Sequence, residues 1–491
     1  MQSYSGLAGE FNTEQYDHIK KKGFVRARRK PLSTFSIDVD TASYANVRRF
    51  LREGRLPPAD AVRIEELINY FDYEYGDPPA DQPFSITTEM SDCPWKQGHR
   101  LAHIALRSKP IATENLPPNS LVFLLDVSGS MSSHDKLPLL KKALALLIDQ
   151  LRPQDRVAIV VYAGAAGLVL DPTHGSEKEK MLRAIDALQA GGSIAGGAGI
   201  QLAYKLARES FMEGGNNRVT LATDGDFNVS VSSDGELVKI IEREREHSVF
   251  LTVLGFGTGN LKDSKMEKLA DHGNGNYAYI DSLLEGRKVL VEQMGGTLLT
   301  VAKDVKLQVE FNPTKVKAYR LIGYENRRLR DEEFNDDKKD AGDLGAGHSV
   351  TALYEIIPAD SDEPVPGVDP LKYQQMVAQG GTDTSHEVLT VKLRYKQPDA
   401  KKSRLLVRTL KEAGPDEEPS RQMVFAFAVA EYGLLLRDSE YKGDADFDRA
   451  FKHANSALGS DDYGRRAEFL FLVKTAKKLV REEERSKAAS R

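Results

Sequence analysis

Acidic and hydroxyl residues directly follow an apolar stretch of the chain. The stretch Leu121 to Leu125 leads into Asp126-Val127-Ser128-Gly129-Ser130. We expect Asp126 at the carboxyl end of a buried strand, where open α/β sheets bind ligands. Ser128 and Ser130, two residues apart on a loop, can direct both hydroxyls at one point. A carboxylate and two hydroxyls suit a hard divalent cation that keeps several waters, which describes Mg²⁺ better than zinc.

A second segment repeats this arrangement. In Val219 to Asp226, Asp224 again ends an apolar run. Two strand-end carboxylates and two serines could therefore meet around one ion. Either half alone is explained by helix N-caps and turn residues. Both halves together, in one α/β frame, indicate a cation site.

The segments that position these residues alternate between strand and helix. Over residues 119–302, short continuous apolar runs are separated by stretches with apolar residues at helical spacing. Continuous runs are typical of strands buried on both faces, and their alternation with helices predicts βαβ units. We expect an α/β domain with a doubly wound, mostly parallel, Rossmann-like sheet. Its strands should lie at Leu121–Leu125, Val157–Val161, Val219–Ala222 and Phe250–Leu254. We expect its last helix at Leu283–Thr300.

The rest of the chain predicts further parts. Residues 1–33 are polar and basic and predict a flexible lead-in. Residues 34–118 predict a segment of helices and strands, and residues 303–410 alternate with a period of two, typical of an antiparallel β-sandwich. We expect these two parts to pack together as one module. Residues 421–482 predict a C-terminal helical subdomain.

Composition excludes several classes of function. The 491 residues carry a formal net charge of −5, so nucleic acid is not an expected partner. The longest apolar run, Met423 to Leu436, contains Glu431 and is too short to cross a bilayer. The first residues lack the regions of a signal peptide, which indicates a cytosolic chain or one whose leader was removed. A single cysteine, Cys93, excludes an intramolecular disulfide.

The two metal-site segments resemble the metal-ion-dependent adhesion site of von Willebrand factor type A domains. The resemblance rests on two motifs, Asp126-x-Ser128-x-Ser130 and Thr223-Asp224-Gly225. The wider sequence is similar to the bacterial YfbK-type subgroup, and this similarity covers nearly the whole chain past residue 30. The stretches that carry it are Pro31 to Tyr44, Asp337 to His348 and Val429 to Arg437.

The resemblance implies a set of ligands. Ser128 and Ser130 would bind the cation directly, and Asp126 and Asp224 directly or through water; the cation would be Mg²⁺, or Mn²⁺ or Ca²⁺. Family members add a threonine from a glycine-rich loop, and the register from the following helix puts Ile194 at its position. Isoleucine cannot bind a cation. Either Ser193 substitutes after a small loop shift, or the site is weakened, or the chain carries a change that disables it.

The resemblance also implies a function. We expect a non-catalytic, adhesion-type module that uses the cation to bind an exposed Asp or Glu of a partner protein. The rim that meets the partner would comprise Met131, His134, Ile194, Asp226 and Phe227. Relatives usually carry a leader, which implies the bacterial cell envelope, with the cytoplasm as the alternative.

Two other functions remain open. One is a metal-independent scaffold or adaptor of an envelope or ATPase-linked complex, which Ile194 would permit. The other is a metal-dependent hydrolase, for which only Asp226 or His134 could serve as the base. Two further segments could hold a second cation, Asp38-x-Asp40 and the acidic loop 336–343, although a helix cap and a solvated loop explain them as well.

Overall fold

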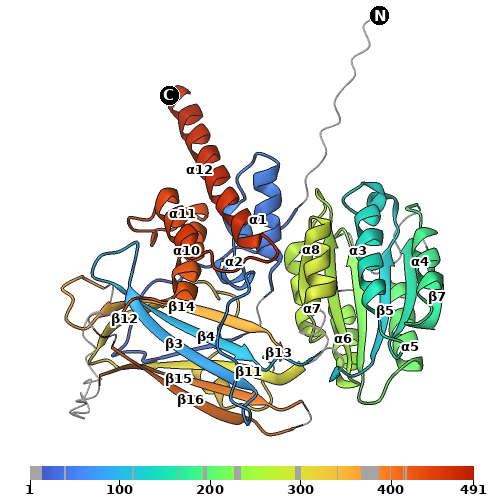
Figure 1. Ribbon diagram of the computed structural model, residues 1–491, viewed down its shortest axis with the longest axis horizontal. Helices are drawn as coiled ribbons and strands as arrows, with labels where there is room; N and C mark the ends of the chain where they lie inside the picture. The colour runs from blue at the N-terminus through green and yellow to red at the C-terminus, as the bar shows by residue number, and fades with distance from the viewer. Residues whose placement is uncertain are drawn as a thin grey trace, which may run out of the picture. The chain divides into compact units, whose positions relative to one another are not determined.

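The computed structural model divides into two compact units (Figure 1), which are described separately. Unit 1 contains residues 1–17 and 112–299, and unit 2 contains residues 18–111 and 300–491. The structure describes residues 14–37, 40–112, 115–163, 165–191, 196–225, 234–293, 300–339, 341–365, 386–398, 400–412, 414 and 417–490.

Unit 1 is built on a six-stranded sheet. The strand order is β10-β9-β8-β5-β6-β7, and every neighbouring pair is parallel except β6 with the edge strand β7. This order confirms the predicted doubly wound, mostly parallel α/β sheet. The strands are β5 (Asn119–Asp126), β6 (Arg156–Ala163), β7 (Ala165–His174), β8 (Asn216–Thr223), β9 (Val249–Phe256) and β10 (Tyr277–Ile280).

Helices cover both faces of this sheet. In Figure 1, α3, α4 and α8 lie on one face and α5, α6 and α7 on the other. Leu140, Leu144 and Leu147 recur at helical spacing along α3 and are buried against the sheet. The helices are α3 (Leu137–Gln150), α4 (Lys178–Asp186), α5 (Gly196–Glu209), α6 (Asp234–Glu246), α7 (Asp263–His272) and α8 (Leu283–Arg287), with one 3₁₀ turn, η3 (Gly129–Ser132), and one π turn, η4 (Lys288–Glu292).

Unit 2 contains two antiparallel sheets that share one apolar core. The first has the order β1-β12-β14-β4-β3; in the second, β13-β11-β15-β16 form a path and β2 also pairs with β11. Period-two alternation along β15 buries Val391 and Leu393 between the sheets. The strands are β1 (Val25–Arg26), β2 (Leu32–Ser36), β3 (Phe84–Asp92), β4 (Arg100–Ser108), β11 (Thr300–Phe311), β12 (Val316–Leu321), β13 (Gly342–Gly345), β14 (Ser349–Pro358), β15 (Glu387–Lys396) and β16 (Arg404–Lys411).

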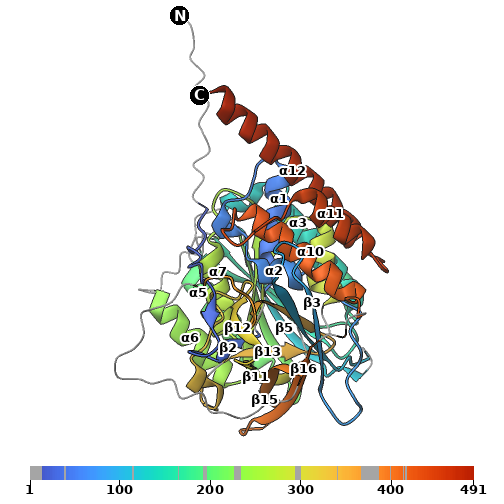
Figure 2. The same cartoon turned by 90° about the vertical axis from the view of Figure 1, so that its left-hand side faces the viewer.

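The helices of unit 2 form a third layer. They gather on the outer face of the sheet that contains β14 (Figures 1 and 2), and one apolar core joins them to it. Helix α10 is apolar around nearly its whole circumference because neighbouring elements bury it on several sides. The helical elements of this layer are α1 (Ala42–Arg52), η1 (Ala59–Ala61), α2 (Ile64–Asn69), α10 (Arg421–Leu436), α11 (Phe447–Ser456) and α12 (Arg465–Ala489). The 3₁₀ turn η5 (Asp331–Phe334) instead contacts β2 and β11 of the other sheet.

The structure corrects three sequence expectations. The lead-in is not flexible throughout, because Val25 pairs with Tyr319 and Ala27 is fully buried. The helices of residues 421–482 do not form a separate subdomain, since they share their core with α1 and α2. The helix expected over 283–300 ends by Glu292 among the described residues, and β11 begins at Thr300.

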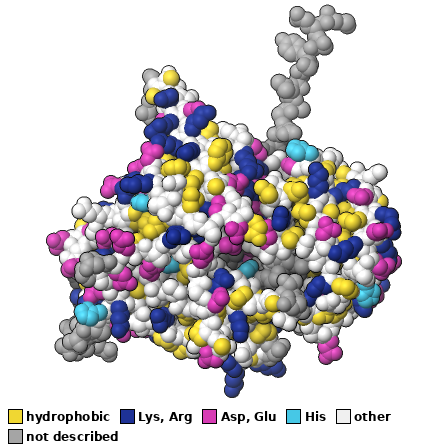
Figure 3. All heavy atoms as spheres, viewed as in Figure 1, with side chains coloured by type: hydrophobic (Ala, Val, Ile, Leu, Met, Phe, Trp, Pro, Cys, Tyr) yellow, Lys and Arg dark blue, Asp and Glu magenta, His cyan; other side chains and the backbone are white. Residues whose placement is uncertain are grey.

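The surface carries both signs of charge. Lys and Arg side chains are interspersed with Asp and Glu on the face drawn in Figure 3, as the net charge of −5 over the whole chain leads one to expect. Among the described residues, no helix combines the length and apolar character needed to span a bilayer.

Candidate functional site

Three strands of unit 1 bring polar side chains to one edge of the sheet. Asp126 is the last residue of β5, and its register partner Tyr162 lies near the end of β6. On the other side of β5, Leu125 pairs with Ala222, and Thr223 then ends β8. Because parallel strands end at the same edge, these side chains and the following Asp224 meet beyond the sheet, as the sequence predicted for the two aspartates.

Asp126 is a fully buried carboxylate held by neutral donors. The backbone N–H of Ser128 donates to Oδ1 at 2.9 Å, and the hydroxyls of Tyr162 and Thr223 donate to Oδ2 at 3.2 and 3.3 Å. Burial raises the pKa of Asp126 above its ordinary value, and the negative charge of Asp224 adds to that rise. Its negative charge is therefore not balanced by any cationic contact among the described residues.

The serine loop directs two hydroxyls at one place. Ser128 Oγ and Ser130 Oγ are 2.9 Å apart, and the turn is closed by a hydrogen bond from Met131 N to Ser128 O at 3.0 Å. The prediction that Met131 lies on the rim is wrong: its side chain is fully buried in the core under the loop. His134 is exposed, as a rim residue must be.

Asp224, the second carboxylate, has a cationic neighbour. It is buried, and Lys136 Nζ donates to its Oδ2 at 2.8 Å. The chain turns sharply after it at Gly225, where φ is +109°. A Cβ at Gly225 would lie 2.5 Å from Asn260 O, so this approach of Asp224 to the site requires glycine.

The glycine-rich loop is attached to the site at both ends. Gly191 N donates to Val127 O at 2.8 Å, and a Cβ at Gly199 would lie 3.0 Å from Cβ of Tyr162. Ser193 and Ile194 lie between these two attachments but outside the described residues, as do the predicted rim residues Asp226 and Phe227.

Sequence reasoning missed Tyr162 and Lys136, and it named Thr223 as part of the motif without giving its side chain a role. Tyr162 and Thr223 satisfy the same rule that selected Asp126, since each lies at the carboxyl end of a buried strand. Lys136 gave no such signal. It precedes α3, and only the course of the chain brings its ammonium group to Asp224.

The two other candidate cation segments contain basic partners. Asp40, which is buried, pairs with Arg327 at 3.2 Å, while Asp38 lies outside the described residues. Within 336–343, Asp337 O accepts a hydrogen bond from Lys396 at 2.6 Å, and the backbone carbonyl of Asp336 accepts one from Lys306. In both places the chain's own cations already contact these oxygens.

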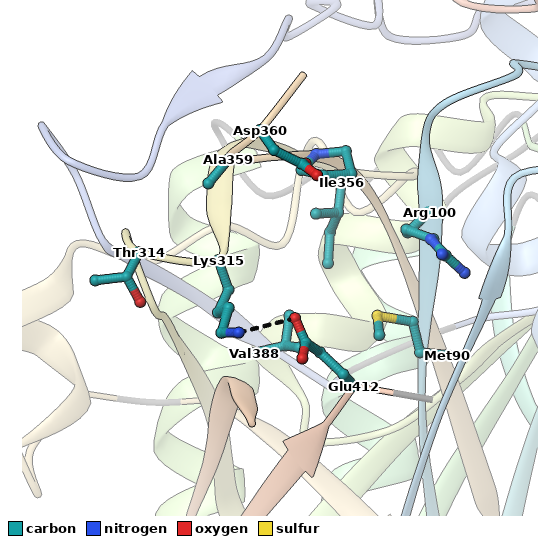
Figure 4. Close-up of a pocket in the computed structure, with 10 residues that line it drawn as sticks. Met90, Arg100, Thr314, Lys315, Ile356, Ala359, Asp360, Val388 and Glu412 are labelled. Atoms are coloured by element: carbon teal, nitrogen blue, oxygen red, sulfur yellow. Dashed lines mark ion pairs between the residues drawn. The ribbon is translucent and has the colours of Figure 1, made fainter. Parts of the chain in front are cut away.

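Unit 2 has a pocket of about 430 Å³ between its two sheets (Figure 4). Met90, Ile356 and Val388 give it apolar walls, and Lys315 and Glu412 form a 3.1 Å ion pair beside them. Thr314, Asp360 and Arg100 complete the polar part of its lining.

Family models match three parts of the chain. Residues 120–292 match the von Willebrand factor type A domain, residues 10–103 match a model described as von Willebrand factor, and residues 296–479 match the C-terminal region of the uncharacterized protein YfbK. Unit 1 therefore contains a type A domain, which is a protein-interaction or adhesion-type module.

The chain is also similar to individual proteins. The uncharacterized protein YfbK of Escherichia coli is 44% identical over 472 residues, which cover 94% of this chain and 81% of that protein. The uncharacterized protein sll0103 of Synechocystis is 27% identical over 45% of this chain and 52% of its own length. A solved structure described as von Willebrand factor type A from Catenulispora acidiphila is 16% identical, covers 77% of this chain and 88% of that one, and has a TM-score of 0.42. The chain belongs to the bacterial YfbK-like family of von Willebrand factor type A proteins.

Proposed function

We propose that the type A domain binds a partner protein through a divalent cation held at the strand-end site. The observation that carries the proposal is the buried, uncompensated charge of Asp126, which receives hydrogen bonds from neutral donors alone. A buried charge without a counter-charge is costly, and a bound cation removes that cost.

The oxygen atoms around Asp126 fit such an ion. Ser128 Oγ and Ser130 Oγ lie within 2.9 Å of each other, and the carboxylate of Asp224 faces the same edge of the sheet. Hydroxyl and carboxylate oxygens are the ligands of Mg²⁺, and of Mn²⁺ or Ca²⁺. The two serines would bind the ion directly, while Asp126, with both oxygens already accepting hydrogen bonds, suits a contact through water.

A bound cation supplies an open coordination position that a carboxylate of the partner can fill. The chain's own residues do the rest. Tyr162 and Thr223 fix the orientation of Asp126, and Ser128 N fixes the serine loop to the same carboxylate. Exposed His134 would lie where the partner's acidic side chain arrives.

A calorimetric titration of Mg²⁺ and Mn²⁺ into metal-stripped protein tests this proposal. We expect saturable binding by the wild-type chain, loss of binding in Asp126→Ala, and no change in Asp186→Ala, which removes an exposed carboxylate of the same domain. Equal heats for the wild-type chain and Asp126→Ala would contradict the proposal. Binding that appears only in Ile194→Thr would mean that Ile194 disables the site.

The alternative is a scaffold or adaptor that binds its partners without metal, in an envelope or ATPase-linked complex. Ile194, at the position where relatives have threonine, favours it. Capture of the same partners by the wild-type chain in EDTA and in Mg²⁺, with Ile194→Thr unchanged, would support this alternative.

We further propose that the module is non-catalytic and works in the cell envelope. Absence of catalysis is consistent with the contacts of the two described carboxylates, since Asp126 accepts hydrogen bonds from neutral donors and Asp224 is paired with Lys136. Turnover of peptide, ester or phosphate substrates with Mn²⁺ would contradict it. The envelope location rests on the family resemblance alone, and fractionation of cells that express the natural gene tests it.

A further inference from the structure

Lys136 is buried in the strand-end site. Only 7% of the residue is exposed, and its Nζ lies 2.8 Å from Asp224 Oδ2. A buried ammonium group is costly unless a carboxylate compensates it, and Asp224 does so here. Lys136 therefore belongs to the site electrostatically, although an ammonium group cannot itself bind a metal ion.

The fold fixes this lysine at both ends. Its backbone lies at the start of α3, where Lys136 N donates to Ser133 O at 3.1 Å and its carbonyl accepts from Leu140 N at 2.8 Å. Its stem runs past Gly257, which has a φ of +71°, and a Cβ at Gly257 would collide with that stem. The Gly257 carbonyl is in turn held by the hydroxyl of Tyr279 at 2.8 Å. The absence of a side chain at Gly257 thus leaves the space that the stem of Lys136 occupies.

The formal charges of the site follow from its members. Among the described residues, Asp126 and Asp224 contribute two carboxylates and Lys136 one ammonium group, so the sum of these three is one negative charge. A divalent cation would change that sum to one positive charge. Without Lys136, the same cation would leave the site neutral, with no net attraction for an anionic ligand.

We propose that Lys136 is a fixed counter-charge that weakens cation binding at this site and makes the cation-loaded site positive, so that it selects an anionic ligand. The inference rests on the proposed function, and it assigns to the chain itself the preference for an acidic partner. Two opposite effects follow from one residue: the lysine repels the metal and attracts the carboxylate.

Replacement of the charge separates these effects. We compare Lys136→Met with Lys136→Gln, which keeps a hydrogen-bond donor, and with Lys142→Met, which removes an exposed lysine from the same helix. Mn²⁺ affinity is measured by electron paramagnetic resonance. Access of a carboxylate is measured by the fall in water-proton relaxation when acetate displaces water from bound Mn²⁺. Circular dichroism shows whether each variant is folded, and Lys136→Gln is the variant to use if Lys136→Met is not.

We expect both Lys136 variants to bind Mn²⁺ at least about tenfold more tightly and to bind acetate at least about tenfold more weakly than the wild-type chain, with Lys142→Met unchanged. If Lys136 were purely structural, its replacement would weaken the binding of both Mn²⁺ and acetate. The wild-type chain could bind Mn²⁺, Asp126→Ala could lose this binding, and the Lys136 variants could bind Mn²⁺ no more tightly than the wild-type chain. That result would overturn this inference and leave the proposed function standing. Binding by the Lys136 variants alone would support the inference and overturn the function proposed for the wild-type chain. Absence of binding in all of them would overturn both.

Discussion

Both units bury carboxylates, and two of these, Glu355 in unit 2 and Asp126 in unit 1, have opposite surroundings. In unit 2, Glu355 accepts a hydrogen bond from His99 Nδ1 at 2.6 Å and pairs with Arg320 through its other oxygen. Burial alone would raise its pKa, but these two contacts hold the pKa of Glu355 below its ordinary value. In unit 1, Asp126 is equally buried and has neutral donors only, so its pKa is raised.

The difference separates a structural carboxylate from one suited to a ligand. Glu355 connects β14 to His99 and to β12, and its charge is balanced within the chain. Asp126 is oriented as firmly by Ser128, Tyr162 and Thr223, yet its charge is left for something else to balance. Burial alone therefore does not distinguish a carboxylate that the chain balances from one that it leaves without a cationic contact.

The largest expected effect comes from breaking the balanced carboxylate. Glu355→Gln should lower the free energy of unfolding by about 3–5 kcal/mol, because it leaves the buried Arg320 without its counter-charge. Urea denaturation measures the loss. Glu363→Gln is the control, since this partly exposed carboxylate also contacts His99, at 2.9 Å, and should cost less than about 1 kcal/mol. Equal losses in the two variants would mean that Glu355 has no special role.

A smaller effect is expected from pH. Burial lowers the pKa of His99, but its contacts with Glu355 and Glu363 raise that pKa by more than burial lowers it. The pKa of His99 therefore lies above 6.5. The charged ring thus stabilises the fold fully below about pH 6.5, and this contribution is lost as the pH rises through the folded-state value. We expect His99→Gln to cost about 2 kcal/mol at pH 6 and progressively less towards pH 9, by urea denaturation. An equal cost at pH 6 and at pH 9 would contradict this expectation.

The smallest effect is expected at the unbalanced carboxylate, and it has the opposite sign. Asp126→Asn should raise the free energy of unfolding of metal-free protein at pH 7 by up to about 1.5 kcal/mol, because it removes a buried charge that has no counter-charge while keeping most hydrogen bonds. The same variant should lose any increase in melting temperature that Mg²⁺ gives the wild-type chain. A clear loss of stability in EDTA would show that the chain balances this charge itself, and the comparison with Glu355 would fail.

Much of the fold was predictable because the periodic signals were local. Continuous apolar runs located β5, β6, β8 and β9, and the rule for strand ends selected Asp126 and Asp224. Met131 was misjudged because its position on the loop does not reveal which way the side chain turns. The lead-in was misjudged because short strands such as β1 form only when a distant partner, here β12, is present.

The sequence by itself determined the class of fold, the strand ends and the carboxyl and hydroxyl side chains that follow them, since all of these depend on residues near one another in the chain. Tertiary structure decided which charges are balanced. Lys136 and Asp224 are 88 residues apart, and His99 and Glu355 are 256 apart. Whether a buried carboxylate meets a cation depends on contacts of this kind, because the cost of burying a charge is set by atoms within a few ångströms, whatever their distance along the chain.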